Sequence, residues 1–112
     1  MAKNPEHRDL FPGALEIMIL QSLRLKPMHG YALVKHIKQV SDDLLPVEEG
    51  SLYPALHRME QNGWIRSEWA LTETNRKAKY YELTAAGRRQ LHEAEKNFEH
   101  LVKGVRAILR YA

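Results

Sequence analysis

Residues 49–63, EGSLYPALHRMEQNG, decide the fold because they read as one amphipathic helix with a defined end. Their apolar residues recur at three- and four-residue steps, as on one face of a helix: Leu52, Ala55, Leu56 and Met59. Gly63 stands where a left-handed residue would end the helix, and Pro54 must lie near its first turn, where a missing N–H costs little. We therefore expect a helix over residues 49–62.

The other face of this predicted helix carries side chains suited to contact with nucleic acid. With the apolar stripe turned to the core, the outward residues are Gly50, Pro54, His57, Arg58 and Gln61, flanked by Ser51 and Tyr53. Arginine can pair bidentately with guanine and glutamine with adenine, and hydroxyl groups suit phosphate oxygens. Without context such a face is more often solvated surface, so its meaning depends on the neighbouring elements.

Downstream, the hydrophobic period changes from that of a helix to that of a strand. Residues 65–71 alternate, residues 78–83 are again rich in aromatic and extended-chain types, and residues 72–77 form a polar turn in which Asn75 best tolerates a positive φ. Trp64 and Trp69 are expected in the hairpin core and a satellite core. Three cations near the turn suit contact with DNA phosphate or a minor groove, or else are ordinary solubilising charge: Arg76, Lys77 and Lys79.

Two shorter helical patterns precede this region, over residues 14–25 and 31–45. Lys26-Pro27 ends the first, because the residue before a proline disfavours the helical region. The second begins behind His29-Gly30. Tyr31, near its start, is either a core aromatic or a hydroxyl that faces phosphate.

The clearest periodicity lies at the C-terminal end, where Thr84 is a candidate N-cap for a helix over residues 85–112. Its apolar positions make the seam of a coiled coil: Leu91, Phe98, Val105 and Ala112 in one seven-residue series, Ala94, Leu101 and Ile108 in another, with Val102 and Leu109 beside them. Such a helix is about 42 Å long, more than a small core can cover. We therefore expect much of the seam to contact a second copy of the chain.

Phe98 lies in the middle of this seam, with the small residue Ala94 one turn before it. Two copies could enclose an aromatic-walled cavity for a flat ligand, although plain coiled-coil packing explains the residue about as well. Gly104 either permits a close helix crossing or is merely tolerated.

The order helix, helix, helix, hairpin, helix is that of a winged helix-turn-helix domain with an appended helix, a mainly α fold of the α+β class. We expect a DNA-binding domain over residues 10–83 and a dimerisation helix over residues 84–112.

Composition limits the remaining possibilities. The chain has 112 residues, no cysteine and a net charge of +3, which indicates one domain without disulfides or thiolate metal sites, in the cytoplasm by default. The opening residues 1–10 lack the apolar core of a signal peptide, and no apolar run could span a membrane. Residues 48–83 carry five basic and six acidic side chains, so DNA binding must depend on folded geometry rather than on a charged arm.

The sequence offers no catalytic or metal-binding pattern. Its six histidines form neither an i, i+4 pair nor an HExxH motif, and there is no glycine-rich phosphate loop and no G-x-S-x-G turn. We expect neither an enzyme nor a bound metal or cofactor.

Several motifs together resemble the DNA-binding domain of PadR-family transcriptional regulators. They are Gly13-Ala14-Leu15, Met28-His29-Gly30-Tyr31, Glu49-Gly50-Ser51-Leu52-Tyr53-Pro54-Ala55-Leu56, Met59-Glu60 to Gly63-Trp64-Ile65, and Lys79-Tyr80-Tyr81-Glu82-Leu83-Thr84-Ala85-Ala86-Gly87. The single C-terminal helix resembles the short branch of the family. This resemblance implies a homodimer that represses transcription and is released, in some members, by small aromatic or hydrophobic ligands. The chain departs from the family in lacking a glycine at the hairpin tip and in entering the third helix through Glu48-Glu49.

The sequence therefore predicts a homodimeric, sequence-specific repressor that binds a palindromic operator in double-stranded DNA. The third helix would enter the major groove and the hairpin would contact flanking phosphate, with the two heads about 34 Å apart. A protein-interaction adaptor that does not bind DNA, and a small-molecule carrier that happens to dimerise, remain the alternatives.

Overall fold

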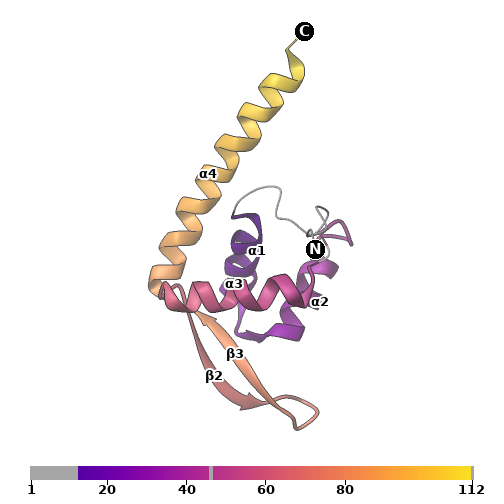
Figure 1. Cartoon of the computed structure of the whole chain (residues 1–112), viewed down its shortest axis with the longest axis vertical. Coiled ribbons are helices and arrows are strands. Elements are labelled where there is room, and N and C mark those ends of the chain that lie inside the picture. Colours follow the sequence, from indigo (N-terminus) through magenta and orange to yellow (C-terminus); the bar gives the residue numbers. More distant parts are fainter. Residues whose placement is uncertain (1–12, 46, 112) are drawn as a thin grey trace, which may run out of the picture.

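The computed structural model describes residues 13–45 and 47–111 of the chain, so predictions for residues 1–12, Pro46 and Ala112 lie outside it. Along this part of the chain the elements are α1 (Ala14–Leu25), β1 (Met28–His29), α2 (Gly30–Val40), α3 (Glu49–Gln61), β2 (Ile65–Leu71), β3 (Lys77–Leu83) and α4 (Ala85–Arg110). Three short helices form the body, the β2–β3 hairpin projects from one end, and α4 runs away from the body at the other (Figure 1). The winged helix-turn-helix fold with a long last helix is confirmed.

The core lies where α1, α2 and α3 meet the base of the hairpin. The apolar stripe predicted on residues 49–62 supplies four of its members: Leu52, Ala55, Leu56 and Met59 are all 0% exposed. Ile19, Leu20 and Leu33 from the first two helices are equally buried, and Ile65 and Leu83 close the core from the hairpin. Each fully buried aliphatic side chain contributes about 1.5–3 kcal/mol to folding, so this small cluster supplies most of the driving force.

The sheet contains a strand that the sequence analysis misses. Its order is β1-β3-β2, all antiparallel, and β1 pairs Met28 with Tyr81 and His29 with Tyr80. A two-residue strand has no periodicity of its own and forms only because β3 presents a free edge to it. The β2–β3 register is regular from Ile65–Leu83 to Leu71–Lys77, as expected for a hairpin.

Two local predictions are wrong. The second helix ends at Val40 rather than near Leu45, because Asp42 and Asp43 adopt left-handed φ values of 58° and 67° that no helix can contain, and Leu44 is left 81% exposed. Trp69 is 63% exposed and not in a satellite core, because β2 extends past the end of the helical body before its chain turns.

Thr84 caps α4 as predicted and also joins it to the rest of the domain. Its hydroxyl oxygen accepts from the Gly87 amide at 3.0 Å and lies 2.7 and 2.9 Å from the carbonyl oxygens of Gly63 and Trp64. Its own amide donates to the Trp64 carbonyl at 3.1 Å. The first turns of α4 are therefore held against the start of β2.

Along α4, burial changes sharply with distance from this junction. Leu91, which the sequence analysis groups with the seam, is 6% exposed and belongs to the core of its own chain. Farther on, Phe98, Leu101 and Val105 are each about 40% exposed, and Ile108 and Leu109 are more than 70% exposed. Among the described residues no helix is both long enough and apolar enough to cross a membrane.

The two glycines of α4 offer a direct test of the junction. A methyl group on Gly87 would collide with the Trp64 backbone carbonyl, whereas one on Gly104 would meet nothing within 4 Å. Gly87→Ala should lower the free energy of unfolding by about 1–3 kcal/mol through this overlap. Gly104→Ala should raise it by about 1 kcal/mol through helix propensity alone. Urea denaturation followed by circular dichroism measures both, and equal stabilisation by the two substitutions would contradict the packing described.

Candidate nucleic-acid interface

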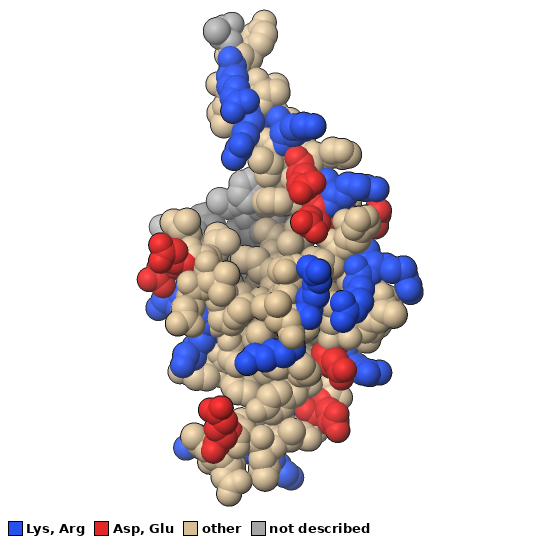
Figure 2. Space-filling model, turned by 180° about the vertical axis from the view of Figure 1, so that it is seen from behind, with Lys and Arg blue, Asp and Glu red and all other residues tan. Residues whose placement is uncertain are grey.

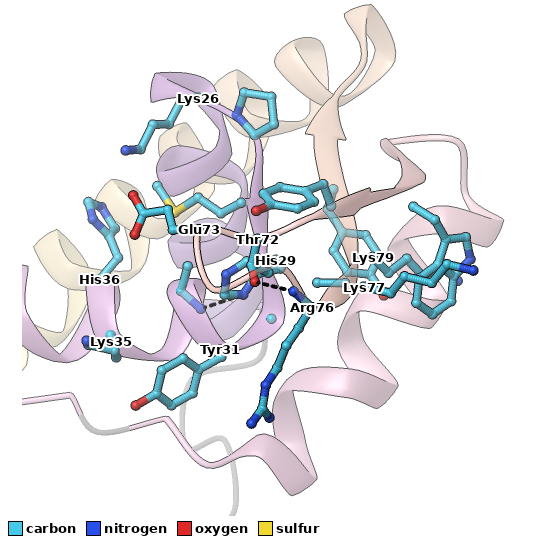
Figure 3. A pocket seen from close by; sticks show the side chains of 18 of the residues that line it. Lys26, His29, Tyr31, Lys35, His36, Thr72, Glu73, Arg76, Lys77 and Lys79 are labelled. Carbon is cyan, nitrogen blue, oxygen red and sulfur yellow. Dashed lines mark hydrogen bonds between the residues drawn. The ribbon is translucent and has the colours of Figure 1, made fainter.

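One large concave surface separates the hairpin from the helical body. We call it the wing cleft; it has a volume of about 1230 Å³ and is lined by residues 26–32, Lys35, His36 and Gln39 before and along α2, by Tyr53 of α3, and by Trp69, residues 72–74 and residues 76–81 of the hairpin, or wing (Figure 3). Five of these side chains are cationic, namely Lys26, Lys35, Arg76, Lys77 and Lys79, and Glu73 is the one carboxylate. The lining therefore carries four more positive than negative charges, against a net +3 for the whole chain.

On the face of the molecule seen in Figure 2, basic and acidic side chains lie interspersed, with several basic groups along α4. The excess of positive charge in the wing cleft is thus a product of folding, because the chain segments that supply it are close to neutral when counted along the sequence.

The first turn of α2 forms one wall of the cleft. His29 is its N-cap, and the His29 Nδ1 accepts from the Ala32 amide at 3.2 Å. The imidazole packs edge-on against the Tyr80 ring at 5.2 Å and lies parallel to the Tyr31 ring, and the Lys35 Nζ lies 5.5 Å from the Tyr31 ring centroid. Tyr31 is 58% exposed, which decides the alternative left open by the sequence: it is not a core residue.

The outward face of α3 is arranged as the apolar stripe predicts. His57, Arg58 and Gln61 are exposed, Ser51 is half-buried and Tyr53 is 44% exposed. Of these, Tyr53 lines the wing cleft, while the other four lie on the adjoining helix surface. A Cβ at Gly30 would come within 2.7 Å of the Tyr53 ring, so glycine at position 30 lets α2 and α3 approach closely enough to share the cleft.

The wing tip is closed by its own polar groups. Asn75 adopts the predicted positive φ of 68° and donates its amide to the Thr72 carbonyl at 2.9 Å, and the Arg76 amide donates to the Thr72 hydroxyl at 3.2 Å. The side chains of Arg76 and Lys77 are exposed beside this turn, where they could reach a phosphate backbone.

Lys79 differs from the other two predicted wing cations. Its Nζ lies 3.7 Å from Oε1 of Glu60 in α3 and 5.9 Å from the Tyr81 ring centroid, well back from the tip. The other oxygen of Glu60 accepts from the Ser67 hydroxyl at 2.6 Å. Burial, with smaller contributions from Glu60 and Tyr53, raises the pKa of the Tyr81 hydroxyl above its ordinary value of 10.0, so Tyr81 is uncharged at neutral pH. Glu60 thus fastens the base of the wing to α3.

Among the cleft residues that the sequence did not predict as part of a binding site are Lys26, His29, Lys35 and Trp69. Lys26 and Lys35 lie on either side of the α2 start and are ordinary surface lysines until the wing is folded opposite them. His29 stands in a motif that points to the family but not to this role. Within residues 13–45 and 47–111 no group of three histidine, aspartate or glutamate side chains is placed to hold a metal ion.

Comparison with known proteins identifies the family. The model of the "Transcriptional regulator PadR-like family" matches residues 19–93, two thirds of the chain and nearly all of its winged-helix portion. The chain belongs to the PadR-like family. Its members are transcriptional regulators and not enzymes, which confirms the family resemblance and the absence of enzymatic function predicted from the sequence.

Individual relatives of this PadR-like protein agree with that assignment. Transcriptional regulator Rv3488 of Mycobacterium tuberculosis is 31% identical over 98 residues, which make up 88% of each chain. The structure of a transcriptional regulator from Clostridium thermocellum superposes with a TM-score of 0.83 at 28% identity, covering 92% of this chain and all of that one. Bacillus subtilis PadR, solved in complex with operator DNA, superposes with a TM-score of 0.64 at 26% identity, over 71% of this chain and 45% of its own.

Proposed function

We propose that this PadR-like regulator binds double-stranded DNA, with α3 in the major groove and the wing cleft on the adjacent sugar-phosphate backbone. The observation that carries the proposal is the charge of the wing cleft, where five cations and one carboxylate line a concavity beside the exposed face of α3. The related PadR from Bacillus subtilis, which shares the fold, was solved with operator DNA. An adaptor that binds no nucleic acid would need an acidic partner to match this charge.

The two parts of the interface have different roles. Arg58, Gln61 and His57 are exposed on α3. A major groove admits one α-helix, so these side chains would reach base edges when α3 lies in it. Tyr31, Tyr53, Arg76 and Lys77 line the cleft and suit phosphate and sugar, which position the protein without reading sequence. Lys79 also lines the cleft, and Ser51 lies on α3 outside it.

We further propose that the protein acts as a homodimer on a palindromic operator. Beyond Leu91 the apolar stripe of α4 continues with only partial cover from residues 13–45 and 47–111 of its own chain, through Ala94, Phe98, Leu101, Val102, Val105 and Ile108. Burial of this stripe against a second copy would place two recognition helices on one face of the DNA. A dimer of this kind represses by occupying its operator.

We also propose that a small ligand relieves repression by binding at the same stripe of α4. Phe98 is 39% exposed in the middle of α4, and the half-buried Ala94 beside it leaves room for a planar apolar ligand between two copies. Such a ligand would shift the separation of the heads only to the extent that it binds one dimer geometry more tightly than the other.

The division of roles within the interface predicts two distinct mutant behaviours. Arg58→Ala should relax preference at particular base pairs, at a cost of about 1–3 kcal/mol for a lost bidentate contact. Lys77→Ala should weaken binding to all sequences alike and reduce the salt slope by about one ion. Fluorescence anisotropy with selected and random duplexes, titrated with salt, separates the two effects. Lys38→Ala, an exposed α2 lysine outside the cleft, is the matched control. Equal losses on both duplexes for Arg58→Ala would show that α3 does not read bases.

The dimer is tested by placing a charge in the stripe. Leu101→Glu should convert the dimer to a monomer at micromolar concentration, because two unpaired carboxylates would be buried opposite each other. His100→Glu adds the same charge on an exposed position next to the stripe and should leave the dimer intact. Sedimentation velocity reports the mass of each, and an unchanged mass for Leu101→Glu would place the interface elsewhere.

The effector site is tested with planar cationic and phenolic compounds. Phe98→Ala should weaken binding of such a compound by about 0.5–1.5 kcal/mol for the lost stacking, while DNA binding without the compound is kept. Phe98→Leu keeps most of the apolar volume but not the ring, so it separates stacking from packing. Isothermal titration measures both variants, and ligand binding that is indifferent to the ring would make the stripe purely structural.

A further inference from the structure

Trp69 occupies the face of the wing that looks toward α3. Its cross-strand partner is Lys79, and Ser67 precedes it by two residues on β2, so the three side chains share one face of the hairpin. Lys79 and Ser67 both contact the Glu60 carboxylate of α3, at 3.7 and 2.6 Å. Trp69 therefore lies in the last residue pair at which the wing is fastened to the helix.

At that position the indole shares the cleft with cationic side chains and has little of the core beneath it. Trp69 lines the wing cleft together with Tyr31, Tyr53 and Arg76, and it is 63% exposed. Leu71, the next residue on the same face, is 60% exposed, which shows that the core ends before this part of the wing. Trp69 and Leu71 together leave apolar surface exposed at the cleft, and aromatic side chains are enriched among the residues that contribute most to binding.

We propose that Trp69 stacks on a sugar or base edge of the DNA strand that enters the wing cleft, and so supplies an apolar, sequence-independent part of the binding energy. This inference rests on the proposed DNA binding. The charge of the cleft argues for nucleic acid as the occupant. In a DNA strand a sugar ring lies between successive phosphates, so the sugar would pack on the indole while the phosphates pair with Lys77, Lys79 and Arg76 of the same cleft. The role differs from that of those cations, since an indole contributes no counterion release.

Fluorescence can observe this contact directly, because the chain has two tryptophans, Trp64 and Trp69. In Trp64→Phe, the remaining Trp69 should be open to acrylamide quenching in the free protein and protected when a random-sequence duplex is added at low salt. In Trp69→Phe, the half-buried Trp64 should show little change on adding the same duplex. Anisotropy of a fluorophore on the duplex reports complex formation independently in each titration.

Affinity provides a second measurement in the otherwise native chain. Trp69→Ala should weaken binding to random and selected duplexes alike, by about 2- to 10-fold, the range expected for one aromatic stacking contact. The salt slope should stay unchanged, in contrast to that of Lys77→Ala. Trp69→Phe should recover most of the loss because it keeps an aromatic ring. Tyr111→Ala removes an aromatic side chain that is 86% exposed just beyond the end of α4, away from the wing, and should bind as the native protein does.

Two results would overturn the inference while leaving DNA binding intact: a DNA complex in which Trp69 stays as open to acrylamide as before, or Trp69→Ala binding with native affinity. Protection of Trp69 that rises with protein concentration in the absence of DNA would assign this face to a second copy of the chain. If the native protein bound no duplex at all, both this inference and the proposed function would fall together.

Discussion

The carbonyl oxygen of Trp64 is the point on which the arrangement of this molecule depends. It accepts the backbone amide of Thr84, lies beside the Thr84 hydroxyl, and closes against Gly87 with no room for a side chain. The end of α3, the base of both wing strands and the first turn of α4 therefore meet within a few residues. Because one residue separates β3 from α4 and three separate α3 from β2, no flexible linker lies between the proposed dimer arm and the proposed DNA-reading elements.

This rigidity gives the proposed regulation a physical basis. A change in the crossing of two α4 helices would be carried to α3 and the wing as rigid bodies, since the junction offers hydrogen bonds and close packing rather than a hinge. The wing is itself tied to α3 by Glu60, which contacts Ser67 and Lys79 at the base of the wing. The two parts of the proposed DNA interface thus keep a fixed relation to each other, and only their separation between two copies of the chain is left to vary.

Folding brings together positive charges from segments that are far apart along the sequence. The chain as a whole has a net charge of +3, and the segment that forms α3 and the wing is slightly acidic when counted along the sequence. In the structure, Lys26 approaches from the end of α1, Lys35 from α2, and Arg76 and Lys77 from the wing, and Glu73 is the one carboxylate in the lining. The departure of this chain from its family at Glu48-Glu49 lies at the start of α3, outside the cleft.

The amino-acid sequence alone determined the elements whose evidence is local and repeated. The stripe of Leu52, Ala55, Leu56 and Met59, the positive φ of Asn75 and the cap at Thr84 each follow from side-chain spacing or backbone preference, so α1, α3, the hairpin and α4 were predicted nearly to the residue. Only the tertiary structure decided features that depend on a partner distant in sequence. The strand at Met28–His29 exists because β3 offers an edge, Leu91 is core because α4 begins against the domain, and Trp69 is exposed because the body ends before the wing does. Periodicity specifies which face of an element is apolar, whereas the extent of its burial depends on where the neighbouring elements stop.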